Sequence, residues 1–91
     1  MTIQEFVAAL NLKFNHTDYE FTADKPGAVN VRIVRSYVGG GQRSVFCFIE
    51  RETGDILKAA SWKAPAKGVR GNLATVDMSK VDPYGSWLYI R

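Results

Sequence analysis

From Tyr19 onward, hydrophobic residues tend to recur at every second position, which is the period of a β-strand with one buried face. Short sequences rich in Gly, Pro and Asp interrupt these runs, as expected for turns. The pattern predicts strands at about residues 19–23, 29–38, 43–50, 56–62 and 87–90. Because the first four strands follow one another through short links, we expect them to pair antiparallel in sequence order.

The first sixteen residues have the period of a helix instead. Hydrophobic side chains spaced three and four positions apart predict one amphipathic helix, with a stripe formed by Ile3, Phe6, Val7, Ala9, Leu10 and Phe14. Thr2 stands three residues before Glu5, which is the spacing of a capping box at a helix N-terminus. Asn15 and His16 are expected to end the helix.

A chain of 91 residues has room for a single core, so we expect one domain spanning residues 1–91. The predicted fold class is α+β: the N-terminal helix packs on an antiparallel meander sheet of four to five strands, with an irregular or short-helical segment at 63–85. The predicted core consists of Phe6, Val7, Leu10, Val29, Val31, Ile33, Val45, Cys47, Ile49, Leu57, Leu88 and Ile90. Phe46 and Phe48 are expected on the opposite face of their strand.

Charge is distributed unevenly along the chain. The net charge is +3, but residues 1–24 hold four carboxylates and one lysine, whereas residues 25–91 hold 11 cations and 5 anions. Between Ile56 and Val76 there is no carboxylate at all, while four cations and one tryptophan occur there: Lys58, Trp62, Lys63, Lys67 and Arg70. A positive segment that contains an aromatic ring is typical of contact with a polyanion.

Two interpretations of this segment remain open. In the first, the five residues form a nucleic-acid-binding site for DNA or RNA, with the cations on phosphates and Trp62 stacked on a base. A short helix at Pro65–Arg70 would place Lys67 and Arg70 on one face. In the second, the segment is a solvated loop whose lysines keep the protein soluble. The alternative function, from a different class, is a protein-interaction module that docks on a host or virion protein through Trp62, Trp87 and Tyr89.

The remaining residues do not predict catalysis. Cys47 is the single cysteine and His16 the single histidine, so neither a disulfide within the chain nor a protein-made metal site is expected. Cys47 lies in an apolar run and is expected to be a buried, unreactive thiol. The glycines at 39–41 are expected to form a hairpin tip. We therefore predict a non-enzymatic cytoplasmic protein without a cofactor, a signal peptide or a membrane span.

The segment Gly54-Asp55-Ile56-Leu57-Lys58-Ala59-Ala60-Ser61-Trp62-Lys63-Ala64-Pro65-Ala66-Lys67, followed by Val69-Arg70-Gly71-Asn72, resembles a segment of small uncharacterised bacteriophage and environmental-virus proteins. The similarity extends over about half of the chain, from residue 45 to 72 with the closing residues 83–91. The resemblance implies a viral accessory protein that acts in the host cell, and it implies no particular activity.

Overall fold

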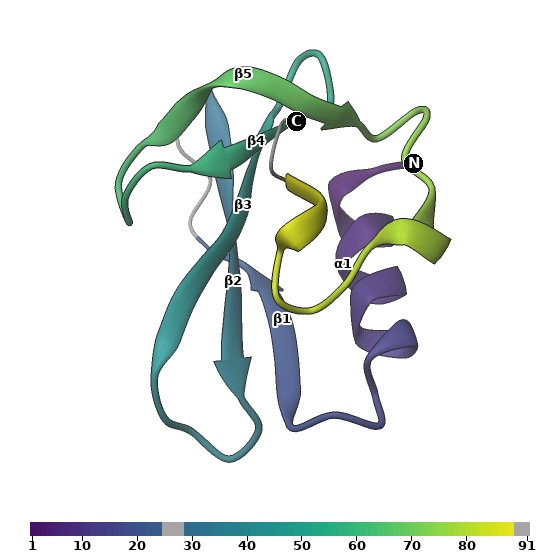
Figure 1. The fold of residues 1–91 in the computed structure, drawn as a ribbon, viewed down its shortest axis with the longest axis vertical. Coiled ribbons are helices and arrows are strands. Elements are labelled where there is room, and N and C mark those ends of the chain that lie inside the picture. Colours follow the sequence, from purple (N-terminus) through teal and green to yellow (C-terminus); the bar gives the residue numbers. More distant parts are fainter. Residues whose placement is uncertain (25–28, 89–91) are drawn as a thin grey trace.

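The computed structural model describes residues 1–24 and 29–88 as an α+β fold, which confirms the predicted class (Figure 1). One helix precedes five strands and two short 3-10 helices, in the order α1 (Ile3–Lys13), β1 (Tyr19–Ala23), β2 (Asn30–Tyr37), β3 (Arg43–Glu50), β4 (Asp55–Ala59), β5 (Pro65–Asn72), η1 (Met78–Lys80) and η2 (Ser86–Leu88). The strands form one antiparallel meander sheet in the order β1-β2-β3-β4-β5.

Helix α1 begins with the predicted capping box. The Thr2 hydroxyl accepts a hydrogen bond from the Glu5 amide at 3.1 Å, and the Glu5 carboxylate accepts one from the Thr2 amide at 2.8 Å. The hydrogen bond from the Thr2 amide to the carboxylate, together with the nearby Thr2 hydroxyl, lowers the pKa of Glu5. Local contacts therefore fix the N-terminus of the helix. Phe6 and Leu10 belong to the core that the helix forms with the sheet, and both are fully buried.

A side chain of α1 occupies part of the β1 edge of the sheet. Asn11 accepts a hydrogen bond from the Phe21 amide at 2.8 Å and donates one to the Phe21 carbonyl oxygen, also at 2.8 Å. Phe21 belongs to the edge strand β1, whose other side pairs with β2. Asn11 thus occupies the backbone groups that a strand from another molecule would need for pairing.

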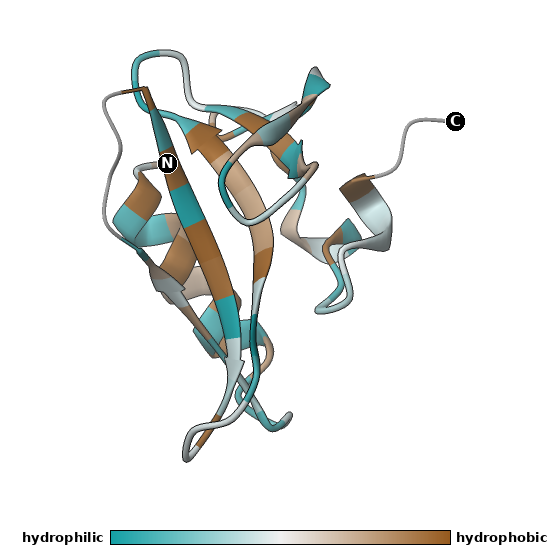
Figure 2. Ribbon diagram, turned by 90° about the vertical axis from the view of Figure 1, so that its left-hand side faces the viewer, coloured by the Kyte–Doolittle hydropathy of each residue, from teal (hydrophilic) through white to brown (hydrophobic). Residues whose placement is uncertain are grey.

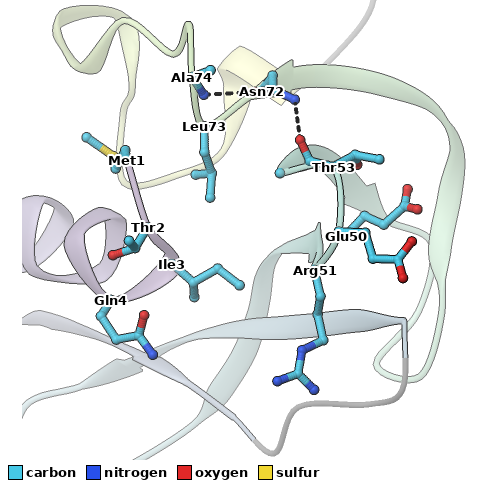
Figure 3. Close-up of a pocket in the computed structure, with 12 residues that line it drawn as sticks. Met1, Thr2, Ile3, Gln4, Glu50, Arg51, Thr53, Asn72, Leu73 and Ala74 are labelled. Carbon is cyan, nitrogen blue, oxygen red and sulfur yellow. Dashed lines mark hydrogen bonds between the residues drawn. The ribbon is translucent and has the colours of Figure 1, made fainter.

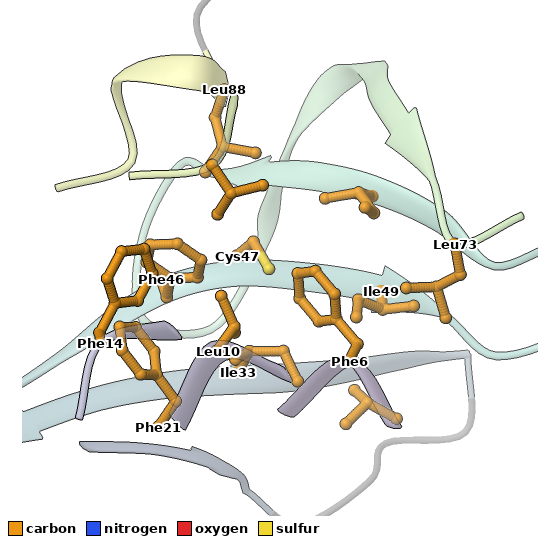
Figure 4. Close-up of a cluster of buried hydrophobic side chains, with 13 residues drawn as sticks. Phe6, Leu10, Phe14, Phe21, Ile33, Phe46, Cys47, Ile49, Leu73 and Leu88 are labelled. Atoms are coloured by element: carbon orange, nitrogen blue, oxygen red, sulfur yellow. The ribbon is translucent and has the colours of Figure 1, made fainter. Parts of the chain in front are cut away.

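The core lies between α1 and one face of the sheet (Figure 4). Phe6 and Leu10 point from the helix toward Ile33 and Ile49 of the central strands. The C-terminal segment completes this core with buried side chains from residues far along the chain, namely Leu73, Val81 and Leu88. The 11 residues of α1 cover only part of this face of the sheet, and the C-terminal segment covers the remainder.

A β-bulge places Phe46 on a face that the sequence pattern did not predict. Ile33 pairs with Cys47 but Val34 pairs with Val45, so Phe46 is an extra residue in β3. Its side chain joins the core cluster, and its ring lies 5.0 Å from that of Phe21 between centroids. The expectation that Phe46 shares the opposite face with Phe48 is therefore wrong, because strict alternation fails at a bulge.

The predicted irregular segment 63–85 contains the fifth strand. Residues 65–72 form β5, while the rest of that segment consists of turns and η1, as expected. The strand predicted at 87–90 is wrong in its described part, because Trp87 and Leu88 belong to η2. Tyr89 and Ile90 lie outside the described residues, as do residues 25–28, which include most of the Asp-, Pro- and Gly-containing link between the first two predicted strands.

Several details of strand ends and faces also differ from the sequence prediction. Strand β4 ends at Ala59 and not at Trp62. Hydropathy alternates along β2 as predicted (Figure 2), but Val29 precedes the strand and is 58% exposed, so it is not a core residue. In β4 the buried residue is Ile56, and Leu57 is only half-buried.

We predict that Asn11→Ala lowers the free energy of unfolding by about 1–3 kcal/mol, because both backbone groups of Phe21 lose their partner. Urea unfolding followed by circular dichroism measures the change. Asn15→Ala is the matched control, since Asn15 is exposed and just beyond the helix. Equal stability of the two variants would contradict the proposed role of Asn11.

We predict that Cys47 does not react with a thiol reagent in the folded protein. The side chain is completely buried, and burial raises the pKa of its thiol, so almost no thiolate forms at neutral pH. Labelling with a maleimide, followed by mass spectrometry, should be fast only after denaturation. Rapid labelling of the native protein would show that the β3 region opens readily.

Candidate nucleic-acid interface

The turn between β4 and β5 brings two of the predicted site residues to an exposed hairpin tip. The chain reverses at Ala60, where the Ala60 and Ser61 amides donate to the Ala64 carbonyl oxygen at 3.0 and 3.1 Å. Trp62 and Lys63 lie within this turn, and both are exposed. The early end of β4 therefore determines that Trp62 lies at the tip and not on a strand.

Trp62 is held against two arginines from neighbouring strands. The Arg32 guanidinium carbon lies 4.7 Å from the centre of the indole, and that of Arg43 lies 5.4 Å away. Arg32 Nε also donates a hydrogen bond to the Trp62 carbonyl oxygen at 2.7 Å. These contacts fix the tip to β2 and β3, yet 39% of Trp62 remains exposed.

The two arginines share one carboxylate. Asp24 Oδ2 lies 2.8 Å from Arg32 Nη1 and 3.9 Å from Arg43 Nη2. The Arg43 side chain is half-exposed, with a relative accessibility of 50%. We call Asp24, Arg32, Arg43 and Trp62 the Trp62 cluster; it contains two cations and one anion, and the exposed Lys63 follows Trp62 directly.

The structure divides the five predicted site residues into three that are exposed and two that are half-buried. Trp62 and Lys63 lie at the hairpin tip, and Lys67 is exposed farther along β5. Lys58 is half-buried and lines a small cavity between the sheet and the C-terminal residues Tyr84 and Leu88. Arg70 is also half-buried and directed toward the C-terminal segment.

Arg70 has a structural position within the sheet. Leu57 pairs with Val69, and Ala59 pairs with Pro65. Two residues along β4 therefore correspond to four along β5, and the extra residues of β5 form a bulge. Arg70 donates hydrogen bonds to three carbonyl oxygens, those of Lys67 at 3.3 Å, Gly68 at 3.2 Å and Leu88 at 2.6 Å. Residues 65–70 lie in strand β5 and do not form the short helix that would have placed Lys67 and Arg70 on one face. Arg70 joins the bulge to η2.

Sequence reasoning missed Asp24, Arg32 and Arg43 as neighbours of Trp62. Arg32 is 30 positions away from Trp62, and no local pattern connects them. The available signal was the alternation in β2, which directs Arg32 away from the side chains of Val31 and Ile33. That alternation assigns a face to Arg32, but only the folded hairpin brings Trp62 to the same face.

A second concave region lies where α1 begins, but its chemistry is less specific (Figure 3). This open cavity of about 480 Å³ lies between the first residues of α1, the β3–β4 turn and the segment after β5. Asn72 closes one side by hydrogen bonds to the Thr53 carbonyl oxygen and the Ala74 amide, at 2.9 and 2.8 Å. Its lining mixes Glu50 and Glu52 with Arg51, which favours no single ligand charge.

Across residues 1–24 and 29–88, no three His, Cys, Asp or Glu side chains are grouped in a way that could hold a metal ion. Among these same residues, no helix is long and apolar enough to cross a membrane.

Fold and surface together define a small α+β protein with one helix on a five-stranded meander and an arginine-flanked tryptophan at a hairpin tip. The chain belongs to a family of unknown function, DUF7717, whose pattern matches residues 2–90. Comparisons with curated proteins and with solved structures gave no match.

We predict that Arg32→Gln loosens the hairpin tip, because it removes the ion pair with Asp24 and the hydrogen bond to the Trp62 carbonyl oxygen. The Ala60 and Ser61 amides should exchange with solvent about 5 to 10 times faster, since a net loss of roughly 1 kcal/mol is typical for such a contact. Hydrogen exchange measured by NMR tests this. Lys80→Gln removes a charge from η1 and should leave the exchange of both amides unchanged. Unchanged exchange in Arg32→Gln would show that the contact between Arg32 and the Trp62 carbonyl oxygen does not hold the hairpin tip.

Proposed function

We propose that this protein binds nucleic acid through the Trp62 cluster together with Lys63 and Lys67. The observation that carries the proposal is an exposed indole at a hairpin tip, flanked by two guanidinium groups at 4.7 and 5.4 Å. An exposed aromatic face can stack on a base, while neighbouring cations bind phosphates. An exposed indole beside cations indicates nucleic-acid binding more specifically than a basic loop alone does.

The position of each charge suggests how the contact is divided. Arg32 is engaged by Asp24 and by the Trp62 carbonyl oxygen, so it holds the ring and does not reach outward. Arg43, Lys63 and Lys67 are exposed and therefore supply the contacts to phosphate. Lys58 and Arg70, although part of the basic segment, face inward and contribute mainly structure and long-range charge.

The binding should depend little on sequence. Contacts to phosphates carry no base information, and stacking on an indole accepts any base. About three phosphate contacts give a modest, strongly salt-dependent affinity. These properties suit a small accessory protein without enzymatic activity that covers exposed nucleic acid. The resemblance of residues 54–72 to small bacteriophage proteins suggests that it acts during infection, in the host cytoplasm.

The geometry favours this proposal over docking on a host or virion protein. The docking hypothesis needs Trp62, Trp87 and Tyr89 on one surface. Trp87 packs against the core residue Phe46, with ring centroids 6.0 Å apart, whereas Trp62 contacts Arg32 on the other face of the sheet. Tyr89 lies outside the described residues.

We predict that labelled oligonucleotides bind at low salt and that affinity falls about 20-fold between about 50 and about 200 mM salt, as three contacts to a single strand imply. Fluorescence anisotropy with single-stranded DNA, single-stranded RNA and duplex DNA measures this. Lys63→Gln or Lys67→Gln should each weaken binding and flatten the salt dependence, because each removes one phosphate contact. Lys80→Gln is the control with the same change of charge. Absence of binding at low salt would exclude the proposal.

Substitutions at Trp62 separate stacking from charge. Trp62→Ala should weaken single-strand binding about 5- to 150-fold, which corresponds to 1–3 kcal/mol for a stacked base. Trp62→Phe keeps a ring and should retain most of the affinity. If Trp62→Ala binds as well as the natural protein, the indole is not part of the interface. A protein captured from nuclease-treated lysate through Trp62, without oligonucleotide binding, would favour the docking alternative.

A further inference from the structure

Strand β2 carries a second arginine whose surroundings differ from those of the Trp62 cluster. Arg35 is three positions after Arg32 and therefore points to the other face of the sheet. It pairs across the sheet with the core residue Phe21. Arg35 lies over the Tyr19 ring, 4.6 Å from its centre, and donates one hydrogen bond to the Pro83 carbonyl oxygen at 2.7 Å.

The charge of Arg35 is not balanced by a carboxylate within the described residues. Both ion pairs found there involve Asp24, with Arg32 and with Arg43. Among these same residues the half-buried Arg70 also has no ion pair with a carboxylate, but three carbonyl oxygens accept its hydrogen bonds. In the described part of the chain, a single carbonyl oxygen accepts a hydrogen bond from Arg35, although a guanidinium has five N–H donors. A half-buried cation with spare donors is favourable when an anion can bind beside it.

A cavity of about 150 Å³ lies next to Arg35. Its lining in the described part of the chain carries hydroxyl, amide and guanidinium groups and no carboxylate, and consists of Tyr19, Arg35, Ser36, Tyr37, Gln42 and Ser44. Ser44 pairs with Arg35 across the β2–β3 ladder, so these two side chains lie on the same face. The three glycines at 39–41 all have positive φ and form the tip of the same hairpin.

We propose that this cavity binds a phosphate group, with the Arg35 guanidinium as the principal donor and the Ser44 hydroxyl and Gln42 amide as further donors. The size suits one tetrahedral oxyanion, and the planar guanidinium can donate two parallel hydrogen bonds to it. The inference is independent of the proposed nucleic-acid contact, since it uses the other face of β2.

Two sources can supply such a group: free phosphate, or a phosphate attached to a nucleoside. The surrounding aromatic rings suit the second source. The Tyr19 ring lies 5.1 Å from that of Tyr37 and 6.1 Å from that of Tyr84, and Tyr84 is 73% exposed. The cavity is too small for a base in addition to a phosphate, so a base would lie outside it, against these exposed rings.

The test is an NMR titration of the full chain with sodium phosphate, adenosine 5′-monophosphate and adenosine, using sodium chloride at matched ionic strength as the reference. We expect saturable shifts at residues 35, 36, 42 and 44, with a dissociation constant of roughly 1 mM or below for phosphate. Equal affinity for phosphate and the monophosphate would assign the site to free phosphate; tighter binding of the monophosphate would assign it to a nucleotide. Shifts that chloride reproduces, or that adenosine alone produces there, would overturn the proposal.

Two variants test the donors separately. Arg35→Lys keeps the charge but loses the planar pair of donors, and should weaken phosphate binding about tenfold. Ser44→Ala should weaken phosphate binding several-fold, and it leaves the contact between Arg35 and the Pro83 carbonyl oxygen intact. This variant therefore tests the site even if Arg35→Lys loosens the C-terminal segment. Lys80→Gln should bind phosphate unchanged. Natural affinity in both site variants would refute the site, whether or not oligonucleotides bind at Trp62.

Discussion

The structure depends on burying one face of the sheet, which α1 alone does not achieve. Phe6 and Leu10 cover the central strands, and the rest of that face is covered by the chain after β5. The bulge at Phe46 matters here because it turns a large ring inward, where it meets Trp87 from η2. The C-terminal segment is therefore part of the core, and Arg70 adds a polar tie from β5 to the Leu88 carbonyl oxygen.

Because the helix and the C-terminal segment both occupy one face, the other face is left to side chains of the sheet itself. Val34 and Phe48 are buried but lie outside the main cluster, and Arg32 lies 6.0 Å from the Phe48 ring. The β4–β5 hairpin tip packs there through Trp62. The exposed indole thus follows from how this sheet covers its second face, and binding nucleic acid would use a residue that also contributes to packing.

The elements that the sequence predicts well are those with local causes. The capping box, the alternation at the start of β2 and the glycine hairpin tip at 39–41, where all three φ angles are positive, each depend on residues a few positions apart. Strand β5 was missed because its proline, two glycines and cations have low strand propensity, and pairing with β4 overrides that preference. The bulge, the inward Arg70 and the contact of Arg32 with Trp62 were missed because each joins distant segments.

The two candidate sites share strand β2, and this shared element constrains how they can act together. Arg32 and Arg35 are close in sequence but reach opposite faces, so a short ligand cannot contact both. A longer single strand could do so only by passing around an edge of the sheet. Asn11 of α1 occupies backbone groups of the β1 edge, so such a path would run around the β5 edge or past the hairpin ends. Arg43 follows the glycine tip of the β2–β3 hairpin and contacts Trp62, so this end of the sheet is where a path between the two sites would be shortest.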